Sequence, residues 1–269
     1  MNRQFPNPLR LLWRIIKNKY DSLNTDAAAR RALIDWNERD TERLEFYRQF
    51  IPPESLVFDV GANMGNRAKI FVRLAARVVA IEPQKRCINI LRSLQTRFPQ
   101  LKLICSALGS NQGKAKMLIS PDHTLSSLSE EWVKTMRISN RFGGDVWKSK
   151  KVVQVRTLDD IIKENGTPSF IKIDVEGYED EVLAGLTSPV KAVSIEFTPE
   201  RMNQSFRSID RLDALGLKTF NFALGEVTTL KLPLWVSADA VKEHLLVYAG
   251  DTVVFGDIYA RKIEDCNMA

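Results

Sequence analysis

The chain has 269 residues, a length that suits one large α/β domain with short appendages. Hydrophobic residues make up 44% of it and charged residues 27%, so that its composition excludes wholesale disorder. The formal net charge of +6 permits a polyanionic partner without requiring one.

The N-terminal part of the chain has a helical and largely polar pattern. Basic side chains surround Leu, Trp and Ile residues over positions 1–20, and the pattern continues to Phe50, shortly before Pro52. A basic amphipathic helix at 1–20 can lie on an anionic membrane, but packing on its own domain or on a second subunit is the more common arrangement. We therefore predict a helical N-terminal extension over residues 1–50 and a core domain over residues 51–269.

The cysteines and the apolar runs bear on the location of the protein. The three cysteines show no CxxC or CxxH spacing, which predicts neither a disulfide framework nor a zinc site and favours a reducing compartment. No apolar run is long enough to cross a bilayer, and residues 1–20 lack the cleavage site of a signal peptide. We expect a cytoplasmic protein, with peripheral membrane contact through residues 1–20 as the alternative.

Short apolar runs alternate with amphipathic stretches in the core domain. The predicted strands are residues 56–60, 78–81, 101–105, 170–174, 192–197, 218–223 and 252–260. The predicted helices are residues 66–76, 85–98, 157–164, 178–186 and 208–215. This alternation indicates an α/β fold with a doubly wound, mostly parallel sheet.

One segment interrupts the alternation. Residues 120–151 contain a Ser-rich piece, two tryptophans and a basic cluster, and an additional strand is predicted at 152–155. A long insertion beside a ligand crevice is often an active-site lid or a substrate-binding loop. We therefore predict that residues 120–151 form an inserted lid or substrate segment.

A glycine-containing bend follows the first predicted strand. Its characteristic residues are Asp59, Gly61, Asn63 and Gly65, at the carboxyl end of a strand, where open α/β sheets bind ligands. Asn63 stands at the middle glycine position of a dinucleotide-binding G-x-G-x-x-G motif, and no P-loop pattern is present. Asp59 would repel a pyrophosphate but attract an ammonium or sulfonium group. The bend therefore favours S-adenosylmethionine over NAD as the cofactor.

A second acidic residue, Glu82, closes the second predicted strand and precedes Pro83. It lies about twenty residues beyond Gly61, the spacing expected of a carboxylate that accepts hydrogen bonds from both ribose hydroxyls. The alternative is a carboxylate that stabilises the N-terminus of the following helix. The order and spacing of the two motifs favour the ribose-binding role.

The most specific segment of the chain is the run IKIDVEGYE at residues 171–179. The segments that support it are residues 58–65, 81–83, 157–159 and 256–258. With these segments the sequence resembles the FkbM family of methyltransferases. The resemblance implies the class I methyltransferase fold, a Rossmann-like sheet of seven strands whose last strand is antiparallel. It also implies O-methylation, commonly of a hydroxyl on a sugar, a polysaccharide or a polyketide.

The resemblance further implies which residues bind S-adenosylmethionine. Those around its methionine part would be Asp59, Gly61, Asn63 and Gly65. Glu82 would hold the ribose, while Ser106 and Ala107 would flank the adenine. The chain departs from the family pattern at Asn66 and Arg67, and residues 120–151 are individual to it. The choice of acceptor is expected to reside in that inserted segment.

Asp174 and Glu176 are the candidate catalytic carboxylates. Two residues apart in an extended segment, they share a face, so that one can orient the substrate while the other accepts the proton of the acceptor hydroxyl. Alternatively, they cap and stabilise the following helix. His123 is a third candidate base, because histidine titrates near neutral pH. Glu196 is expected either to line the acceptor pocket or to pair with a cation. We predict no metal, since no diagnostic ligand spacing is present.

The basic and aromatic residues of the insert have two interpretations. They are Arg137, Arg141, Lys148, Lys150 and Lys151, with Trp132 and Trp147 nearby. Indole faces stack on sugars and arginine binds carboxylate or phosphate, so that the group could hold an anionic or sugar-bearing substrate. The alternative is a solvated basic face.

Three functional hypotheses follow. The leading one is O-methylation of a hydroxyl on a sugar, polysaccharide or glycolipid acceptor. Nucleic-acid methylation ranks below it, because the chain reads Asp174-Val-Glu-Gly where base-methylating enzymes often carry an Asp/Asn-Pro-Pro-Tyr motif. The third hypothesis is a non-catalytic, cofactor-binding protein that acts at a membrane surface or as a scaffold through residues 1–20. The oligomeric state is not predicted.

Overall fold

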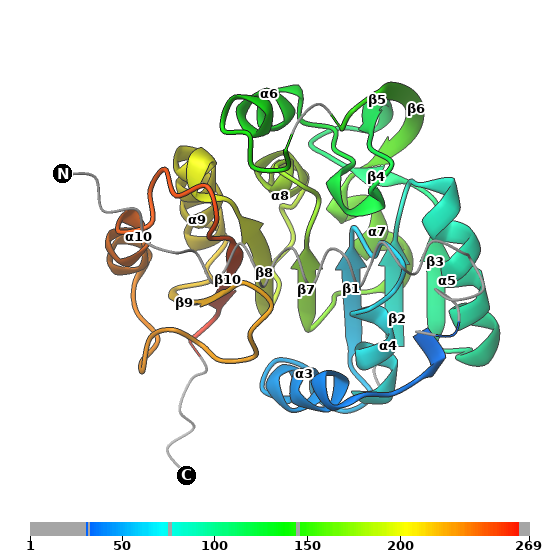
Figure 1. Ribbon diagram of the computed structural model, residues 1–269. Helices are drawn as coiled ribbons and strands as arrows, with labels where there is room; N and C mark the ends of the chain where they lie inside the picture. Colours follow the sequence, from blue (N-terminus) through cyan, green and yellow to red (C-terminus); the bar gives the residue numbers. More distant parts are fainter. Residues whose placement is uncertain (1–30, 32, 75–76, 144–145, 264–269) are drawn as a thin grey trace, which may run out of the picture.

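A seven-stranded sheet forms the centre of the protein (Figure 1). The computed structural model describes residue 31 and residues 33–74, 77–143 and 146–263. The strand order is β3-β2-β1-β7-β8-β10-β9, and all neighbours are parallel except that β10 runs antiparallel to both β8 and β9. This order and the reversed last strand confirm the predicted class I methyltransferase fold. The strands are β1 (Leu56–Val60), β2 (Arg77–Ile81), β3 (Leu101–Ile104), β7 (Phe170–Ile173), β8 (Ala192–Phe197), β9 (Thr219–Leu224) and β10 (Gly256–Arg261).

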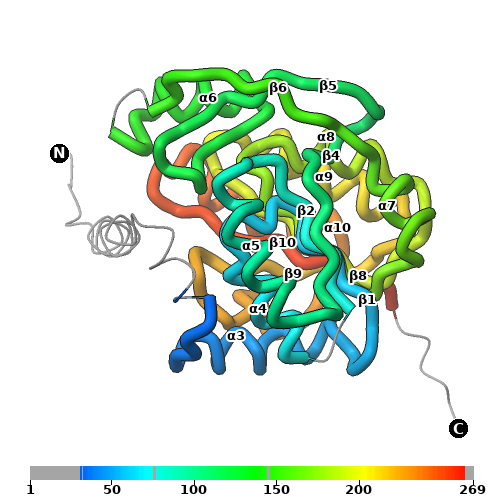
Figure 2. Tube along the Cα trace, turned by 90° about the vertical axis from the view of Figure 1, so that its right-hand side faces the viewer, coloured from blue at the N-terminus to red at the C-terminus, as the bar shows by residue number. Residues whose placement is uncertain are grey.

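Helices cover both faces of this sheet, which explains why the central strands are apolar on both sides (Figures 1 and 2). One face packs against α3 (Glu38–Arg48), α4 (Ala68–Phe71), its extension η1 (Val72–Leu74) and α5 (Lys85–Arg97). The other packs against α7 (Leu158–Asn165), α8 (Glu179–Ala184), α9 (Met202–Ala214), preceded by η3 (Pro199–Arg201), and α10 (Ala238–Leu246). Each face therefore has its own hydrophobic core.

The helix predicted at 208–215 begins earlier, at Met202, and two other predicted elements begin later than expected for local reasons. The helix predicted at 66–76 starts only at Ala68, because the residues before it form a loop with left-handed backbone angles. The strand predicted at 252–260 starts only at Gly256. Before it, the carboxylate of Asp251 accepts two main-chain N–H groups of the following residues at 2.6 and 2.9 Å and closes a turn.

Helix α3 is the main described element of the predicted N-terminal extension. Its first turn is fixed by a capping box between Asn37 and Asp40. Asp40 also pairs with Lys69 of α4 at 2.7 Å, and both side chains are buried. The aromatic rings that join α3 to the sheet and to α4 are Phe46, Tyr47, Phe50, Phe71, Phe170 and Tyr259. Helix α3 therefore packs into the core of the domain.

Residues 1–30 and residue 32 of the extension, which include the amphipathic segment 1–20, lie outside the described residues. The division of the chain at residue 50 stays a prediction. Within the described ranges, no helix combines the length and the apolar character needed to cross a bilayer.

The part of the chain between β3 and α7 forms a second, smaller sheet with the strand order β4-β6-β5. Its strands are β4 (Ala107–Leu108), β5 (Gly113–Ile119) and β6 (Ser149–Arg156), so that the strand predicted at 152–155 is part of β6. The predicted insert contains η2 (His123–Leu125) and α6 (Glu130–Ile138). Figure 1 shows α6, β5 and β6 together on one side of the large sheet.

Phe50→Ala tests the packing of the segment that directly follows α3. The ring of Phe50 is 5% exposed and stacks on Phe170 and Tyr259, with centroids 5.3 and 5.1 Å apart. Its truncation is expected to lower the free energy of unfolding by about 3–5 kcal/mol in a denaturant titration. Ile138→Ala, at a side chain that is 76% exposed, serves as the control and should change it by less than about 0.5 kcal/mol. Equal stability of the two variants would contradict the packing.

Candidate active site

A pocket lies where the strand order reverses, between β1 and β7. Its lining comes from the segments that follow β1, β2, β7 and β8, together with parts of the insert and residues just before β10. In an open α/β sheet, the crevice at such a switch point is the usual ligand site. The predicted cofactor residues that line it are Asp59, Gly61, Asn63, Glu82, Ser106 and Ala107.

Gly61 brings the ends of two strands into contact. It has a φ of +79°, and a Cβ atom there would lie only 1.9 Å from the main-chain oxygen of Asp174. The N–H groups of Gly61 and Ala62 both donate to the carbonyl of Ile81, at 3.0 and 3.1 Å. Asn63 also has a left-handed φ of 50°. The loop is therefore held between β2 and the end of β7, and no residue other than glycine fits at position 61.

Gly65 closes this loop but does not line the pocket. It has a φ of +92°, and a Cβ atom there would lie 2.8 Å from Cδ2 of Leu91 in α5. Its N–H donates to the carbonyl of Ala62 at 2.8 Å. Gly65 thus serves the turn and the packing of α5, and its place around the methionine part of the cofactor stays a prediction.

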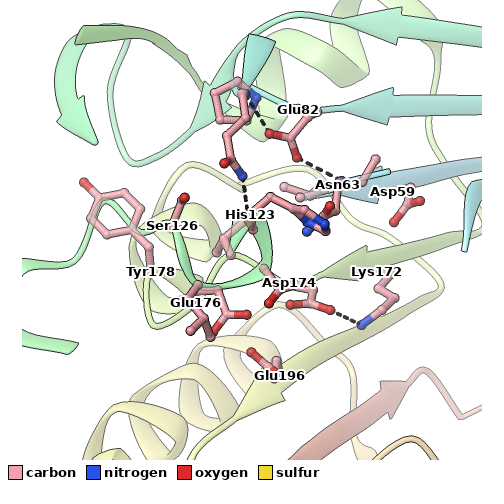
Figure 3. A pocket seen from close by; sticks show the side chains of 18 of the residues that line it. Asp59, Asn63, Glu82, His123, Ser126, Lys172, Asp174, Glu176, Tyr178 and Glu196 are labelled. Atoms are coloured by element: carbon pink, nitrogen blue, oxygen red, sulfur yellow. Dashed lines mark hydrogen bonds and ion pairs between the residues drawn. The ribbon is translucent and has the colours of Figure 1, made fainter. Parts of the chain in front are cut away.

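Glu82 is buried at the end of β2, at 2% exposure, with its carboxylate directed towards the glycine loop (Figure 3). One oxygen accepts the N–H of Asn63 at 2.9 Å, and the other accepts the N–H of Gln84 at 2.7 Å. Burial raises the pKa of Glu82 to about 7, although these hydrogen bonds act in the opposite direction. Each carboxylate oxygen has a further lone pair, so that Glu82 can accept two more hydrogen bonds from a ligand.

Buried side-chain atoms of Asp59 and Ser106 lack a partner at the pocket among the described residues. Asp59, at 2% exposure, has an unpaired Oδ2, and Ser106 has an unpaired Oγ. Burial raises the pKa of Asp59 to about 7, although Lys172 and Arg67 lower it. Unpaired buried polar atoms are rare in native proteins. Both atoms are therefore placed to bind a polar ligand.

The loop between β7 and α8 is held by a carboxylate of its own. One oxygen of Glu179 accepts the N–H groups of Val175 and Gly177 at 3.1 and 3.2 Å. These bonds stabilise a turn in which Glu176 has a φ of 56° and Gly177 a φ of 81°. Helix α8 has Tyr178 as its N-cap, without a side-chain hydrogen bond. The alternative in which Asp174 caps this helix is thereby excluded.

The insert is fastened to the same loop. Ser127 donates its hydroxyl to the main-chain oxygen of Glu176 at 2.6 Å. The indole of Trp132 packs on Gly177, where a Cβ atom would lie 2.2 Å from the ring. From the other side, Gln204 of α9 donates to the carbonyl of Gly177 at 2.8 Å. The insert thus helps to position Glu176, while its role as a lid stays a prediction.

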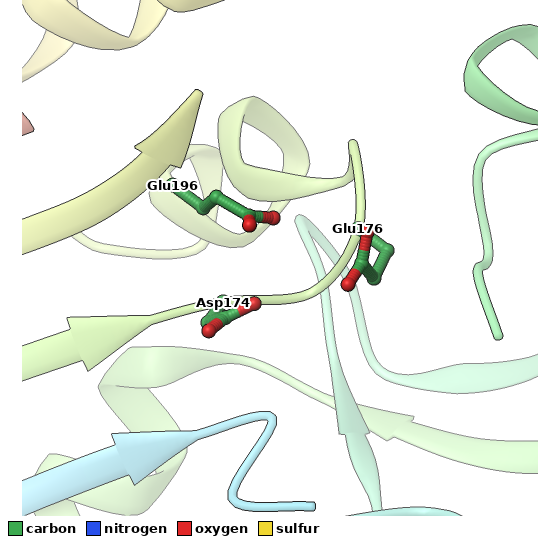
Figure 4. A group of neighbouring side chains, drawn as sticks. All are labelled: Asp174, Glu176 and Glu196. Atoms are coloured by element: carbon green, nitrogen blue, oxygen red, sulfur yellow. The ribbon is translucent and has the colours of Figure 1, made fainter. Parts of the chain in front are cut away.

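Three carboxyl groups converge at one end of the pocket, from Asp174, Glu176 and Glu196 (Figure 4). One oxygen of each lies within 4.8 Å of the others. Burial, together with the neighbouring carboxylates, raises the pKa of Glu176 and of Glu196 well above the ordinary value. We call these residues the carboxylate trio. It is chemically suited to accept a proton, and its hard oxygen atoms are also ligands that divalent cations prefer.

The buried Lys172 neutralises part of this acidic region. Its ammonium group lies 3.2 Å from the carboxylate of Asp174 and 3.1 Å from that of Asp257. All three residues share one face of the sheet because side chains alternate along β7 and β10. Asp174 is therefore held in an ion pair, whereas Glu176 and Glu196 have no cation within ion-pair distance among the described residues.

His123 also lines the pocket, from the insert. Its main-chain oxygen accepts a hydrogen bond from the side chain of Gln84 at 2.9 Å, and its Nδ1 has no partner among the described residues. Burial lowers the pKa of His123, so that its imidazole is neutral near pH 7. It therefore remains chemically able to accept a proton, next to the loop that follows Glu82.

The two tryptophans of the insert do not face the pocket. Trp132 and Trp147 are buried and pack edge to face, with centroids 5.7 Å apart. The indole N–H of Trp147 donates to the carbonyl of Leu125 at 2.5 Å. The interpretation of these rings as a stacking platform for sugars is therefore wrong, because they form the hydrophobic core of the insert.

The basic residues of the insert are likewise engaged or distant. Arg141 lines the pocket, but it forms two hydrogen bonds with Glu200, at 2.7 and 2.5 Å, and a third with the carbonyl of Val254 at 2.8 Å. The exposed residues that lie outside the pocket lining are Arg137, Lys148, Lys150 and Lys151. Of the two interpretations of this group, the structure favours the solvated face.

Several pocket residues could not be recognised from the motifs. Lys172 lies two positions before Asp174, so that strand alternation could have placed it on the same face. Arg39, Glu226 and Phe255 also line the pocket, from α3, from the loop after β9 and from the residues before β10. Nothing in the sequence connects these three segments, which meet only in the folded chain.

The profile of the methyltransferase FkbM domain matches residues 59–220, which is more than half of the chain. The chain belongs to the FkbM family of methyltransferases. The matched residues of this FkbM-family chain include the glycine loop, Glu82 and the carboxylate trio. Family membership confirms the resemblance seen in the sequence.

Curated relatives are similar to parts of the chain. Methyltransferase sdnD of Sordaria araneosa is 29% identical over 163 residues, covering 51% of this chain and 62% of the relative. The 2-O-methyltransferase NoeI of Sinorhizobium fredii is 25% identical over 180 residues (58% and 68%). Hexuronic acid methyltransferase AglP of Haloferax volcanii is 27% identical over 147 residues (52% and 54%). The matches to the first and third span less than two thirds of those proteins.

Solved structures show a weaker similarity to this chain than the curated relatives do. The precorrin-6y C5,15-methyltransferase of Geobacter metallireducens has a TM-score of 0.43 and 11% identity, covering 84% of this chain and 86% of that one. The fold of the FkbM-family chain is defined by its own strand order.

Gly177→Ala tests the contact between the insert and the carboxylate-bearing loop. The added methyl group would collide with the ring of Trp132, so that the free energy of unfolding should fall by about 1–3 kcal/mol more than in the control. The control is Gly216→Ala, which shares a positive φ of +89° but has no atom within 4 Å of the added Cβ. Denaturant unfolding followed by tryptophan fluorescence measures both. Equal losses would mean that the backbone angle alone matters.

Proposed function

We propose that the protein transfers the methyl group of S-adenosylmethionine to a hydroxyl group of a carbohydrate acceptor. The observation that carries this proposal is the layout of the pocket (Figure 3). Glu82, which has spare acceptor capacity, lies on one side of it, and the carboxylate trio lies on the other. A methyl donor and a hydroxyl acceptor require these two functions next to each other.

The residues around the glycine loop fit the cofactor. Glu82 would accept the two ribose hydroxyls, and the unpaired hydroxyl of Ser106 would bind a polar atom of the adenine, with Ala107 beside it. Asp59 and Asn63 would lie near the ammonium group of the methionine part. When bound, S-adenosylmethionine supplies an electrophilic methyl group on a sulfonium sulfur.

Glu176 is the proposed general base. It is presented by the turn that Glu179 stabilises, and its raised pKa makes it a better proton acceptor than an ordinary carboxylate. Asp174, paired with Lys172, would accept a hydrogen bond from the acceptor hydroxyl and orient its oxygen. Glu196, beside Glu176, would share the proton that Glu176 takes up.

The carbohydrate acceptor is supported by the relatives. One is named a 2-O-methyltransferase and another a hexuronic acid methyltransferase. Two aromatic side chains that line the pocket, Phe142 and Phe255, would offer apolar faces to a sugar ring. A polar acceptor with several hydroxyls also suits a lining rich in carboxylates.

Glu82→Gln tests the cofactor site. With wild-type protein, the affinity for S-adenosylhomocysteine, measured by calorimetry, should rise from about pH 5.5 to about pH 8, because only the ionised carboxylate accepts both ribose hydroxyls. The variant should bind about a hundredfold more weakly at pH 8 and lose most of this rise. The control is Glu164→Gln, at an exposed carboxylate outside the pocket. Unchanged affinity of Glu82→Gln would mean that the ribose binds elsewhere.

Glu176→Gln tests the base. Turnover should fall by about a hundredfold or more, while the affinity for S-adenosylhomocysteine stays within about twofold of wild type. In wild-type protein, kcat should rise with pH through an apparent pKa above that of an ordinary glutamate. His123→Asn should reduce turnover less, and a larger loss there would transfer the base role to the histidine. Activity abolished by EDTA and restored by Mg²⁺ would assign the carboxylate trio to metal binding.

The acceptor class is tested with a cell extract. The protein is incubated with methyl-labelled S-adenosylmethionine and a total extract of its native cell, and the labelled products are fractionated. Label is expected in carbohydrate or glycolipid. Label confined to RNA or to protein would overturn the proposed acceptor, and no transferred label with bound cofactor would favour a non-catalytic role.

A further inference from the structure

Three arginines and one glutamate meet beside the pocket and form what we call the arginine cluster. Arg39 and Arg43 belong to α3, and Glu226 follows β9. Only Arg67, after the glycine loop, lies within the matched family residues 59–220. The cluster is therefore built mainly from segments outside the matched family residues.

The geometry of the cluster brings several guanidinium groups together. Arg39 and Arg43 are four residues apart in α3 and so lie on the same helix face. Arg43 and Arg67 both bind the same oxygen of Glu226, at 2.7 and 2.6 Å. Although burial acts in the opposite direction, Arg67 and Arg43 lower the pKa of Glu226, so that it stays ionised. A single carboxylate thus holds two of the three arginines in place.

The cluster carries an excess of positive charge. Its three arginines and one glutamate have a formal charge of 3 − 1 = +2. Of the basic residues that line the pocket, Lys172 pairs with Asp174 and Arg141 pairs with Glu200. Arg39 lines the pocket without an ion-pair or hydrogen-bond partner among the described residues.

We propose that the acceptor carries an anionic group, a carboxylate or a phosphate on the sugar, and that Arg39 and Arg67 bind it. This inference rests on the proposed function and names its substrate class. Guanidinium groups bind carboxylates and phosphates by paired, charge-assisted hydrogen bonds, which Arg39 is free to form. Glu226 acts as a positioning residue, because it orients Arg67 from the side.

Charge also determines how such an acceptor lies. The carboxylate trio repels an anion, so that the anionic group is directed to the arginine cluster while a neutral hydroxyl faces Glu176. Phe255 lines the pocket next to the cluster: its carbonyl accepts the N–H of Gly225 at 2.6 Å, one residue before Glu226. The sugar ring would pack on this phenyl ring, between the anionic group and the reacting hydroxyl.

The experiment compares matched acceptors that differ only in charge. They are para-nitrophenyl β-D-glucuronide, the uncharged para-nitrophenyl β-D-glucoside, and the same glucoside with a phosphate on its primary hydroxyl. Methyl transfer from labelled S-adenosylmethionine yields kcat/KM for each, and calorimetry yields their affinity for the protein saturated with S-adenosylhomocysteine. For wild-type protein, kcat/KM should be about tenfold or more higher for at least one anionic acceptor than for the uncharged glucoside. This preference should become smaller at high salt. A preference for the glucuronide would identify a carboxylate as the recognised group, and a preference for the phosphorylated glucoside would identify a phosphate.

Arg39→Gln should lower that preference by about tenfold. The matched control is Arg48→Gln, the same charge change on the same helix at an exposed residue outside the pocket lining, which should keep the wild-type preference. Arg67→Gln removes the second guanidinium but also an ion pair to Glu226, so its thermal unfolding is measured alongside. Arg39 has no such partner in the described part of the chain. The result for the Arg39 variant is therefore the decisive one in the event that the Arg67 variant does not fold.

The possible results separate this inference from the proposed function. Equal kcat/KM for the neutral and anionic glycosides, or an unchanged preference in Arg39→Gln, would overturn the anionic acceptor and leave carbohydrate methylation standing. Selective, Arg39-dependent binding of an anionic glycoside without methyl transfer would support the anion site and count against the proposed reaction on these acceptors. If no glycoside is methylated and none is bound selectively, the anion site is overturned as well.

Discussion

The close approach of two main-chain segments, at Gly61 and at Asp174, is the constraint on which the pocket depends. Because no Cβ atom fits between Gly61 and the carbonyl of Asp174, the loop that follows β1 lies directly against the end of β7. That contact puts the elements proposed to bind the cofactor beside those proposed to activate the acceptor. A bulkier residue at either point would separate the two functions, and binding alone would not bring the reacting groups together.

The charge of the site is arranged around this contact by a lysine at the centre of the sheet. Lys172 pairs with Asp174 and Asp257, two of the acidic groups that share its face, while Glu176 and Glu196 have no ion-pair partner among the described residues. Burying several carboxylates together is costly unless some are paired and others can take up a proton. The raised pKa of Glu176 and of Glu196 is the consequence, and it is what makes a carboxylate useful as a base.

The residues matched by the family profile include the proposed reaction machinery and the insert, while α3 and the loop after β9 lie outside them. The insert fixes Glu176 through Ser127 and through Trp132, whose indole serves as core rather than as a binding surface. Arg141 ties the insert to Glu200. The arginines of α3 come from before the family domain, and Glu226 comes from after it. Relatives that share the central motifs can therefore differ in their acceptors.

The sequence by itself determined the parts of the protein that depend on neighbouring residues. Alternating apolar runs predicted the parallel sheet, and the spacing from Gly61 to Glu82 predicted a cofactor site, because glycine geometry and strand periodicity act over a few residues. The run 171–179, with its supporting segments, carried the resemblance to the family. Only the tertiary structure decided which side chains meet across the sheet. The pairing of Lys172 with Asp257, the approach of Glu196 to Glu176 and the meeting of Arg43 with Glu226 each join residues from separate elements. Such contacts depend on strand order and helix packing, which no local pattern specifies.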